Sequence, residues 1–96
     1  MMGANYQRMP PALPPEIIDQ IWCEIIPGEE SAGVRTAFIK GDALPSDQLK
    51  RDFAQAAMEY PHFATIPDIQ QALGISVWSA MKITQDVKRK ARETRR

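Results

Sequence analysis

The chain has 96 residues, of which 44% are hydrophobic and 25% are charged, so it can form one small globular domain with a modest core. No apolar run approaches the roughly 20 residues of a membrane span, and residues 1–11 lack the apolar segment of a secretory signal, so we expect a cytoplasmic protein that does not associate with a membrane. Cys23 and His62 are the single cysteine and histidine, which excludes an internal disulfide and argues against a metal site.

The charges are unevenly distributed along the chain, although the formal net charge is zero. Residues 1–81 carry 5 Lys/Arg against 10 Asp/Glu, whereas residues 82–96 carry 7 Lys/Arg against 2 Asp/Glu. A basic segment attached to an acidic body indicates a polyanionic partner. Cations also stabilise the C-terminal end of any helix, so the pattern fits a solvated helix end as well.

The N-terminal part of the chain predicts a flexible segment, which we call the N-terminal lead, followed by a helix. Residues 1–15 are rich in proline, and we expect a flexible, extended conformation for them. A helix is predicted from Pro15 to Ile26, because its isoleucines and Trp22 recur along one face, and Pro27-Gly28 ends it. That apolar face is either the core side of the helix or a surface for a protein partner.

The middle of the chain predicts two further elements. Residues 31–40 fit a helix capped by Ser31 or a strand, and we favour the helix because no other segment offers a strand to pair with. A clear helix is predicted from Ser46 to Tyr60 and is ended by Pro61. Its predicted buried stripe consists of Leu49, Phe53, Ala56, Ala57 and Tyr60. The side chain of the loop residue Phe63 is predicted to be buried in the core.

The segment Thr65 to Lys90 predicts two helices joined by a tight turn. Thr65 and Asp68 have the spacing of a capping box, and Gly74 stands where a left-handed residue ends the short first helix. Ser76 is a suitable cap for the second helix. The inner face of that helix is predicted to consist of Val77, Ala80, Met81, Ile83 or Thr84, and Val87. Together the elements predict an all-α bundle of four to five helices over residues 16–90, followed by a basic tail at 91–96.

This segment resembles the helix-turn-helix superfamily of DNA-binding regulators. The apolar positions around the turn glycine match the pattern of that superfamily at Ile69, Leu73, Ile75, Ala80 and Ile83. One position departs from it, because Gln70 stands where a small residue usually lets the two helices touch. The resemblance covers about a quarter of the chain and implies a helix-turn-helix at 65–90.

The resemblance also implies which residues contact double-stranded DNA. Helix 76–90 would lie in the major groove and present Ser76, Trp78, Ser79, Lys82 and Gln85 to base edges. Phosphates would be contacted by Lys88, Arg89, Lys90, Arg92, Arg95 and Arg96. For Trp78 the sequence leaves two alternatives open, an exposed DNA contact or burial against the first helices.

These observations favour a DNA-binding protein, either a transcriptional regulator or an accessory factor of the phage or plasmid type. Such proteins usually bind as dimers, so a homodimer is a candidate state. One candidate seam runs along the last helix through Val77, Ala80, Thr84, Val87, Ala91 and Thr94, although these residues also fit an intramolecular core. The alternative function is a helical adaptor that binds a protein through the apolar helix 16–26. No glycine-rich phosphate loop or nucleophile–base pair occurs, so we expect no enzyme activity and no cofactor.

Overall fold

Within residues 13–95, which the computed structural model describes with side chains up to Glu93, the chain forms five α-helices and one short 3-10 helix. The α-helices are α2 (Pro15–Ile25), α3 (Ala32–Lys40), α4 (Asp47–Met58), α5 (Ile66–Leu73) and α6 (Val77–Arg95), and the 3-10 helix is η1 (Glu29–Ser31). No strand occurs in this range, which confirms the predicted all-α class. Most of the lead predicted at 1–15 lies outside the described residues; Leu13 packs on the core and Pro15 begins α2.

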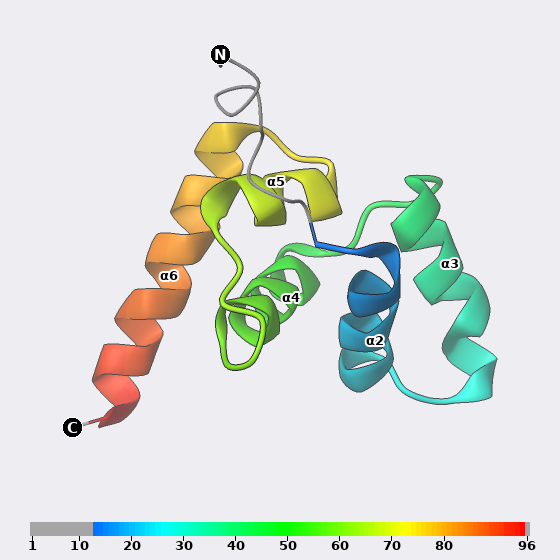
Figure 1. Cartoon of the computed structure of the whole chain (residues 1–96), viewed down its shortest axis with the longest axis horizontal. Helices are drawn as coiled ribbons and strands as arrows, with labels where there is room; N and C mark the ends of the chain where they lie inside the picture. Colours follow the sequence, from blue (N-terminus) through cyan, green and yellow to red (C-terminus); the bar gives the residue numbers. More distant parts are fainter. Residues whose placement is uncertain (1–12, 96) are drawn as a thin grey trace, which may run out of the picture.

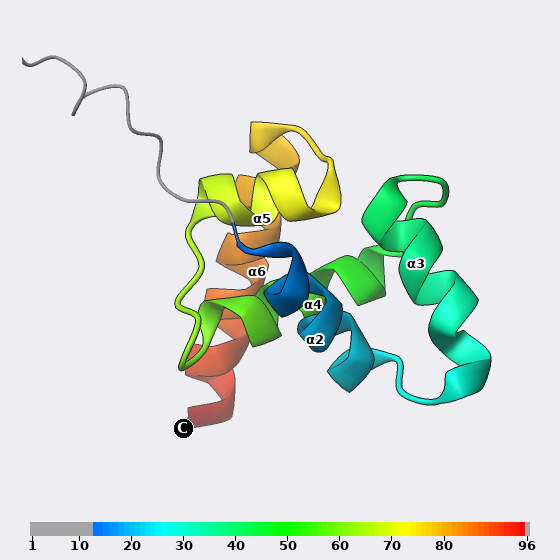
Figure 2. The ribbon, with the colours of Figure 1, turned by 45° about the vertical axis from the view of Figure 1, so that its right-hand side comes forward.

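The helices are arranged so that α6 forms one edge of the molecule. In Figure 1, α6 lies at one edge, α3 lies at the opposite edge, and α2 and α4 lie between them. α6 packs against α4 and against α5, which crosses its N-terminal half. The turned view in Figure 2 shows the same order of helices and the same separation of α3 from α6. One side of α6 is therefore covered by other helices and its other side faces solvent.

The core is built around Trp22 of α2. Its indole is 1% exposed and lies between two phenylalanine rings, with ring centroids 5.0 Å from Phe38 of α3 and 4.8 Å from Phe53 of α4. Offset or tilted aromatic pairs at such distances stabilise a core beyond the effect of buried area alone. The other buried apolar residues in this cluster are Ile21, Ala54, Ala57, Ile69 and Leu73. The apolar face predicted for the first helix is thus the core side of α2.

The segment left open between helix and strand is the helix α3. Gly41 ends it in the left-handed conformation, with φ 84°, and so lets the chain turn toward α4. The Arg35 guanidinium donates hydrogen bonds to the carbonyl oxygens of Ile26 and Gly28, which ties α3 to the end of α2. Ser31 precedes the helix but makes no capping hydrogen bond, because η1 runs directly into α3.

Two aromatic residues after α4 lie where the sequence did not predict them. α4 begins as predicted, since the Ser46 hydroxyl accepts from the Leu49 N–H at 3.2 Å, but it ends at Met58. Glu59 is extended, so Tyr60 leaves the helical register and is 81% exposed instead of buried. Phe63 is 66% exposed and packs edge-on against Tyr60 with ring centroids 6.0 Å apart, so the prediction that it fills the core is wrong.

The turn between α5 and α6 has the predicted geometry. The Thr65 N–H and hydroxyl both donate to Asp68 Oδ2, at 3.0 and 2.9 Å, and so fix the start of α5. Gly74 ends α5 at φ 66° and ψ 37°, and the Gln70 carbonyl accepts from the N–H groups of Gly74 and Ile75. The half-buried Ile75 then packs on the core. These contacts set the direction in which α6 leaves the turn.

Candidate nucleic-acid interface

The inner face of α6 anchors this helix to the rest of the molecule. Ala80 and Thr84 are buried, and Ile83 and Val87 are half-buried against the core. The Thr84 hydroxyl donates to the Met81 carbonyl at 2.9 Å, so this buried polar group is satisfied within the helix. Three residues of the seam considered for a dimer, Ala80, Thr84 and Val87, are therefore covered by the chain's own helices. Within that seam, Val77 and Ala91 are exposed, and the side chain of Thr94 is not among those described.

The opposite face of α6 carries a continuous row of exposed side chains, which we call the outer row. Its members are separated by four, three, four and three residues, which places them on one face of an α-helix. From the N-terminal end they are Trp78, Lys82, Gln85, Arg89 and Arg92. At a rise of 1.5 Å per residue the outer row extends over about 21 Å. It contains three cations and no carboxylate of its own, and one of the cations, Arg89, pairs with the neighbouring Asp86 at 3.0 Å, so the excess charge of the row is positive.

Ser76 and Ser79 lie at the N-terminal end of α6 and bond to each other. The Ser76 hydroxyl accepts from the Ser79 N–H at 3.2 Å, as a helix cap does, and donates to the Ser79 hydroxyl at 3.1 Å. Both residues are exposed. The Ser76 hydroxyl is therefore engaged as both donor and acceptor in starting the helix, and the Ser79 hydroxyl accepts from it, although the sequence predicted both as DNA contacts.

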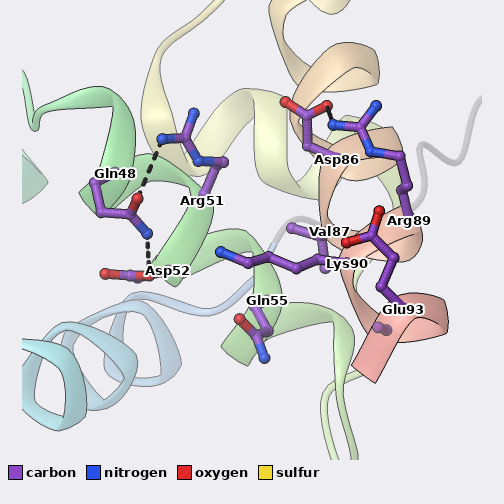
Figure 3. Close-up of a pocket in the computed structure, with 10 residues that line it drawn as sticks. Gln48, Arg51, Asp52, Gln55, Asp86, Val87, Arg89, Lys90 and Glu93 are labelled. Carbon is purple, nitrogen blue, oxygen red and sulfur yellow. Dashed lines mark hydrogen bonds and ion pairs between the residues drawn. The ribbon is translucent and has the colours of Figure 1, made fainter. Parts of the chain in front are cut away.

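Lys88 and Lys90, which were predicted with Arg89 and Arg92 as one basic group, lie on two other sides of α6. Lys88 lines a small hollow beside the loop that carries Phe63. Lys90 extends from α6 toward α4, as Figure 3 shows. The structure therefore separates the basic end of α6 into the outer row and two flanking lysines.

The hollow between α4 and α6 is lined by charges of both signs and has a volume of about 530 Å³. Its cations, Arg51, Arg89 and Lys90, are matched in number by its carboxylates, which are Asp52, Asp86 and Glu93. Arg89 pairs with Asp86 at 3.0 Å, while Gln48 donates to Asp52 and accepts from Arg51 (Figure 3). Balanced charges do not favour a polyanion here. Arg89 belongs to both surfaces, and the outer row adds the cations Lys82 and Arg92 without a carboxylate of its own.

Helix α2 offers little exposed apolar surface for the alternative of an adaptor. Ile21 and Trp22 are buried, and the remaining isoleucines of the helix are half-buried against the core. Apart from Pro15, its exposed residues are polar and consist of Glu16, Asp19, Gln20 and Glu24. The exposed aromatic pair Tyr60 and Phe63 is the surface feature that sequence reasoning missed. The available signal was Pro61, because a proline disfavours the helical conformation in the residue before it, which is Tyr60.

Comparisons with protein-family models, with curated proteins and with solved structures found no match to the chain. None of the described helices is long and apolar enough to cross a membrane. Among the described residues, no group of three or more His, Cys, Asp or Glu side chains lies together as a metal site would require. The geometry and charge of the surface are therefore the observations from which a function can be inferred.

Proposed function

We propose that the protein binds double-stranded DNA by placing the outer row of α6 against the major groove, as a transcriptional regulator or an accessory DNA-binding factor does. The observation that carries the proposal is the outer row itself. It joins hydrogen-bonding side chains to three cations, without a carboxylate among them, on a helix that is supported from behind by α4 and α5. The major groove, about 12 Å wide, admits a single α-helix.

The proposal divides the outer row into two parts with different tasks. Lys82 suits the acceptor atoms of guanine, and Gln85 suits the donor and acceptor pair of adenine. Arg89 and Arg92 are further along the helix, where it would leave the groove and meet phosphate oxygens. Contacts of the first kind supply sequence discrimination, and contacts of the second kind supply affinity that depends on salt.

The flanking lysines provide a matched test of this docking. We compare the double variant Arg89→Gln, Arg92→Gln with the double variant Lys88→Gln, Lys90→Gln, which removes the same charge from the same turns of α6. Binding to a mixed-sequence duplex is measured by fluorescence anisotropy at several salt concentrations. If DNA lies on the outer row, the arginine variant binds more weakly, and its logarithmic salt slope falls by about 0.9 for each phosphate contact removed. The affinity and the salt slope of the lysine variant should change less than those of the arginine variant.

Two results would count against the proposal. Equal losses in the two double variants would mean that the basic end attracts DNA without docking the outer row. An absence of duplex binding by the unmodified chain at low salt would refute DNA binding altogether. Random-sequence selection with the unmodified chain, followed by the same selection with Lys82→Gln, then tests base readout. The exposed Lys40→Gln in α3 serves as its control, because it makes the same substitution far from α6.

A further inference from the structure

Trp78 is the largest side chain of the outer row, and the fold leaves it in solvent. It is 76% exposed, whereas Trp22, of the same residue type, is 1% exposed. Tryptophan is on average one of the more buried residues of folded proteins. Val77 beside it is 42% exposed, so the first turn of α6 presents a small apolar surface at the end of a basic row. A tryptophan so exposed, with a second apolar residue beside it on a basic face, is a candidate contact surface for a partner.

The first turn of α6 presents little else that could read a ligand. The hydroxyls of Ser76 and Ser79 bond to each other, and the Ser76 hydroxyl also caps the helix. The indole of Trp78 combines a broad apolar ring system with one N–H donor. Hydrogen-bonding side chains of the outer row follow at Lys82 and Gln85, so the apolar contact comes first along the helix and the polar contacts come after it.

We infer that Trp78 contacts the 5-methyl group of a thymine in the major groove, so that the ligand is a duplex with thymine at the position facing the first turn of α6. This inference rests on the proposed function and adds a specificity-determining residue to it. The thymine methyl is the apolar group that base edges expose in the major groove. Trp78 and Gln85 are about 10 Å apart along the helix axis, which corresponds to about three base-pair steps when the helix follows the groove.

The composition of the outer row favours duplex DNA over a single strand. Proteins that bind single strands stack successive bases on several aromatic side chains. The outer row has one aromatic residue, and its other members are Lys82, Gln85, Arg89 and Arg92. The exposed aromatic residues Tyr60 and Phe63 pack edge-on against each other in the loop after α4 and do not extend the row.

The test removes one methyl group from the DNA at a time. A site is obtained by random-sequence duplex selection with the full chain, and each thymine in it is replaced in turn by deoxyuridine, which lacks only the 5-methyl group. We expect one replacement to weaken binding by the unmodified chain about fourfold, the factor that corresponds to about 0.8 kcal/mol for one buried methyl-sized group. Trp78→Ala should bind the thymine site more weakly and should bind the thymine and deoxyuridine duplexes equally.

Tyr60→Ala is the matched control, because it removes an exposed aromatic residue in the loop after α4, outside the outer row, and should keep the fourfold methyl effect. Circular dichroism checks that both variants fold. Three results overturn the inference. Trp78→Ala could still bind the thymine duplex more tightly than the deoxyuridine duplex, no deoxyuridine replacement could weaken binding by the unmodified chain, or the selection could return no enriched thymine. Tighter binding of the unmodified chain to single-stranded oligothymidine than to the duplex overturns it too. The proposed function remains supported in each of these cases if duplex binding depends on salt and requires Arg89 and Arg92. If the chain binds no duplex at all, the proposed function and the inference about Trp78 are both wrong.

Discussion

Helices α2 and α6 each carry a tryptophan on an amphipathic pattern, yet the two indoles lie in opposite environments. Trp22 has isoleucines three and four residues away, at Ile18, Ile25 and Ile26, so its position belongs to the apolar stripe that forms the core. Trp78 has Lys82 four residues away and Gln85 seven residues away, so its position belongs to the polar side of α6. The register of neighbouring residues, more than residue type, decides which tryptophan is buried.

The comparison also separates stability from binding. The large apolar side chains of α2 are used in the core, and its exposed side chains include the carboxylates of Glu16, Asp19 and Glu24. α6 is held by small or medium side chains, such as Ala80 and Thr84, and its exposed face is basic. Substitutions in α2 should therefore act mainly on the free energy of unfolding, and substitutions on the outer row should act mainly on DNA affinity.

The largest expected effect tests this separation with the two tryptophans. Trp22→Ala should lower the free energy of unfolding by about 3 to 5 kcal/mol, because it leaves a cavity between Phe38 and Phe53. Trp78→Ala should change it by no more than about 0.5 kcal/mol, as is usual for an exposed site. Urea denaturation followed by circular dichroism measures both values. Similar losses of unfolding free energy in the two variants would show that Trp78 also supports the fold. If Trp22→Ala does not fold, the milder Trp22→Phe replaces it in the comparison.

Local sequence signals were sufficient for much of this fold. Ser46, the Thr65–Asp68 pair and Gly74 act within three or four residues of the chain, so their roles could be predicted before any tertiary contact was known. The position of Trp78 was left open by the sequence, because Lys82 lies four residues after it whereas the apolar Ile75 and Met81 lie three residues before and after it.

The sequence predictions were wrong where the end of a helix depends on contacts with residues far along the chain. Tyr60 has helical spacing from Phe53 and Ala57, but α4 stops at Met58, and the Ala64 N–H donates to the Ala57 carbonyl across the following loop. That return of the chain places Tyr60 and Phe63 outside, and no periodicity in the sequence reports it. The division of the basic end into the outer row and two flanking lysines followed from which face of α6 packs on α4 and α5.

The next largest effect on the free energy of unfolding is expected at Gly74, in the turn between α5 and α6. Gly74→Ala should lower the free energy of unfolding by about 1 to 2 kcal/mol, since a Cβ disfavours the left-handed conformation at φ 66°. No atom lies within 4 Å of that Cβ position, so backbone strain alone causes the loss. Gly33→Ala in α3 is the matched control, with equally open space, and should stabilise the protein by about 0.5 to 1 kcal/mol. Thermal denaturation of both variants checks the opposite signs.

A smaller loss is expected at the start of α5. Asp68→Ala removes the acceptor of both Thr65 donors and should cost about 1 kcal/mol, as the loss of a helix cap usually does. Because the cap supports the α5–α6 pair and does not touch the outer row, DNA affinity of the folded variant should stay near that of the unmodified chain. Denaturation and anisotropy measurements on the same sample separate the two effects. A loss of affinity without a loss of stability would place Asp68 in the binding surface.

The smallest effect on stability is expected at Asp86, the carboxylate paired with Arg89 at 3.0 Å. Asp86→Asn should change the free energy of unfolding by only about 0.2 to 0.5 kcal/mol, because the pair lies on a helix surface at i, i+3 spacing. The same change removes a negative charge beside the outer row and leaves Arg89 available to a phosphate, so duplex binding should become tighter and its salt slope steeper. Glu24→Gln on α2 makes the same change in net charge far from the outer row. If it tightens binding equally, the attraction reflects net charge alone, and the contrast between α2 and α6 does not extend to DNA.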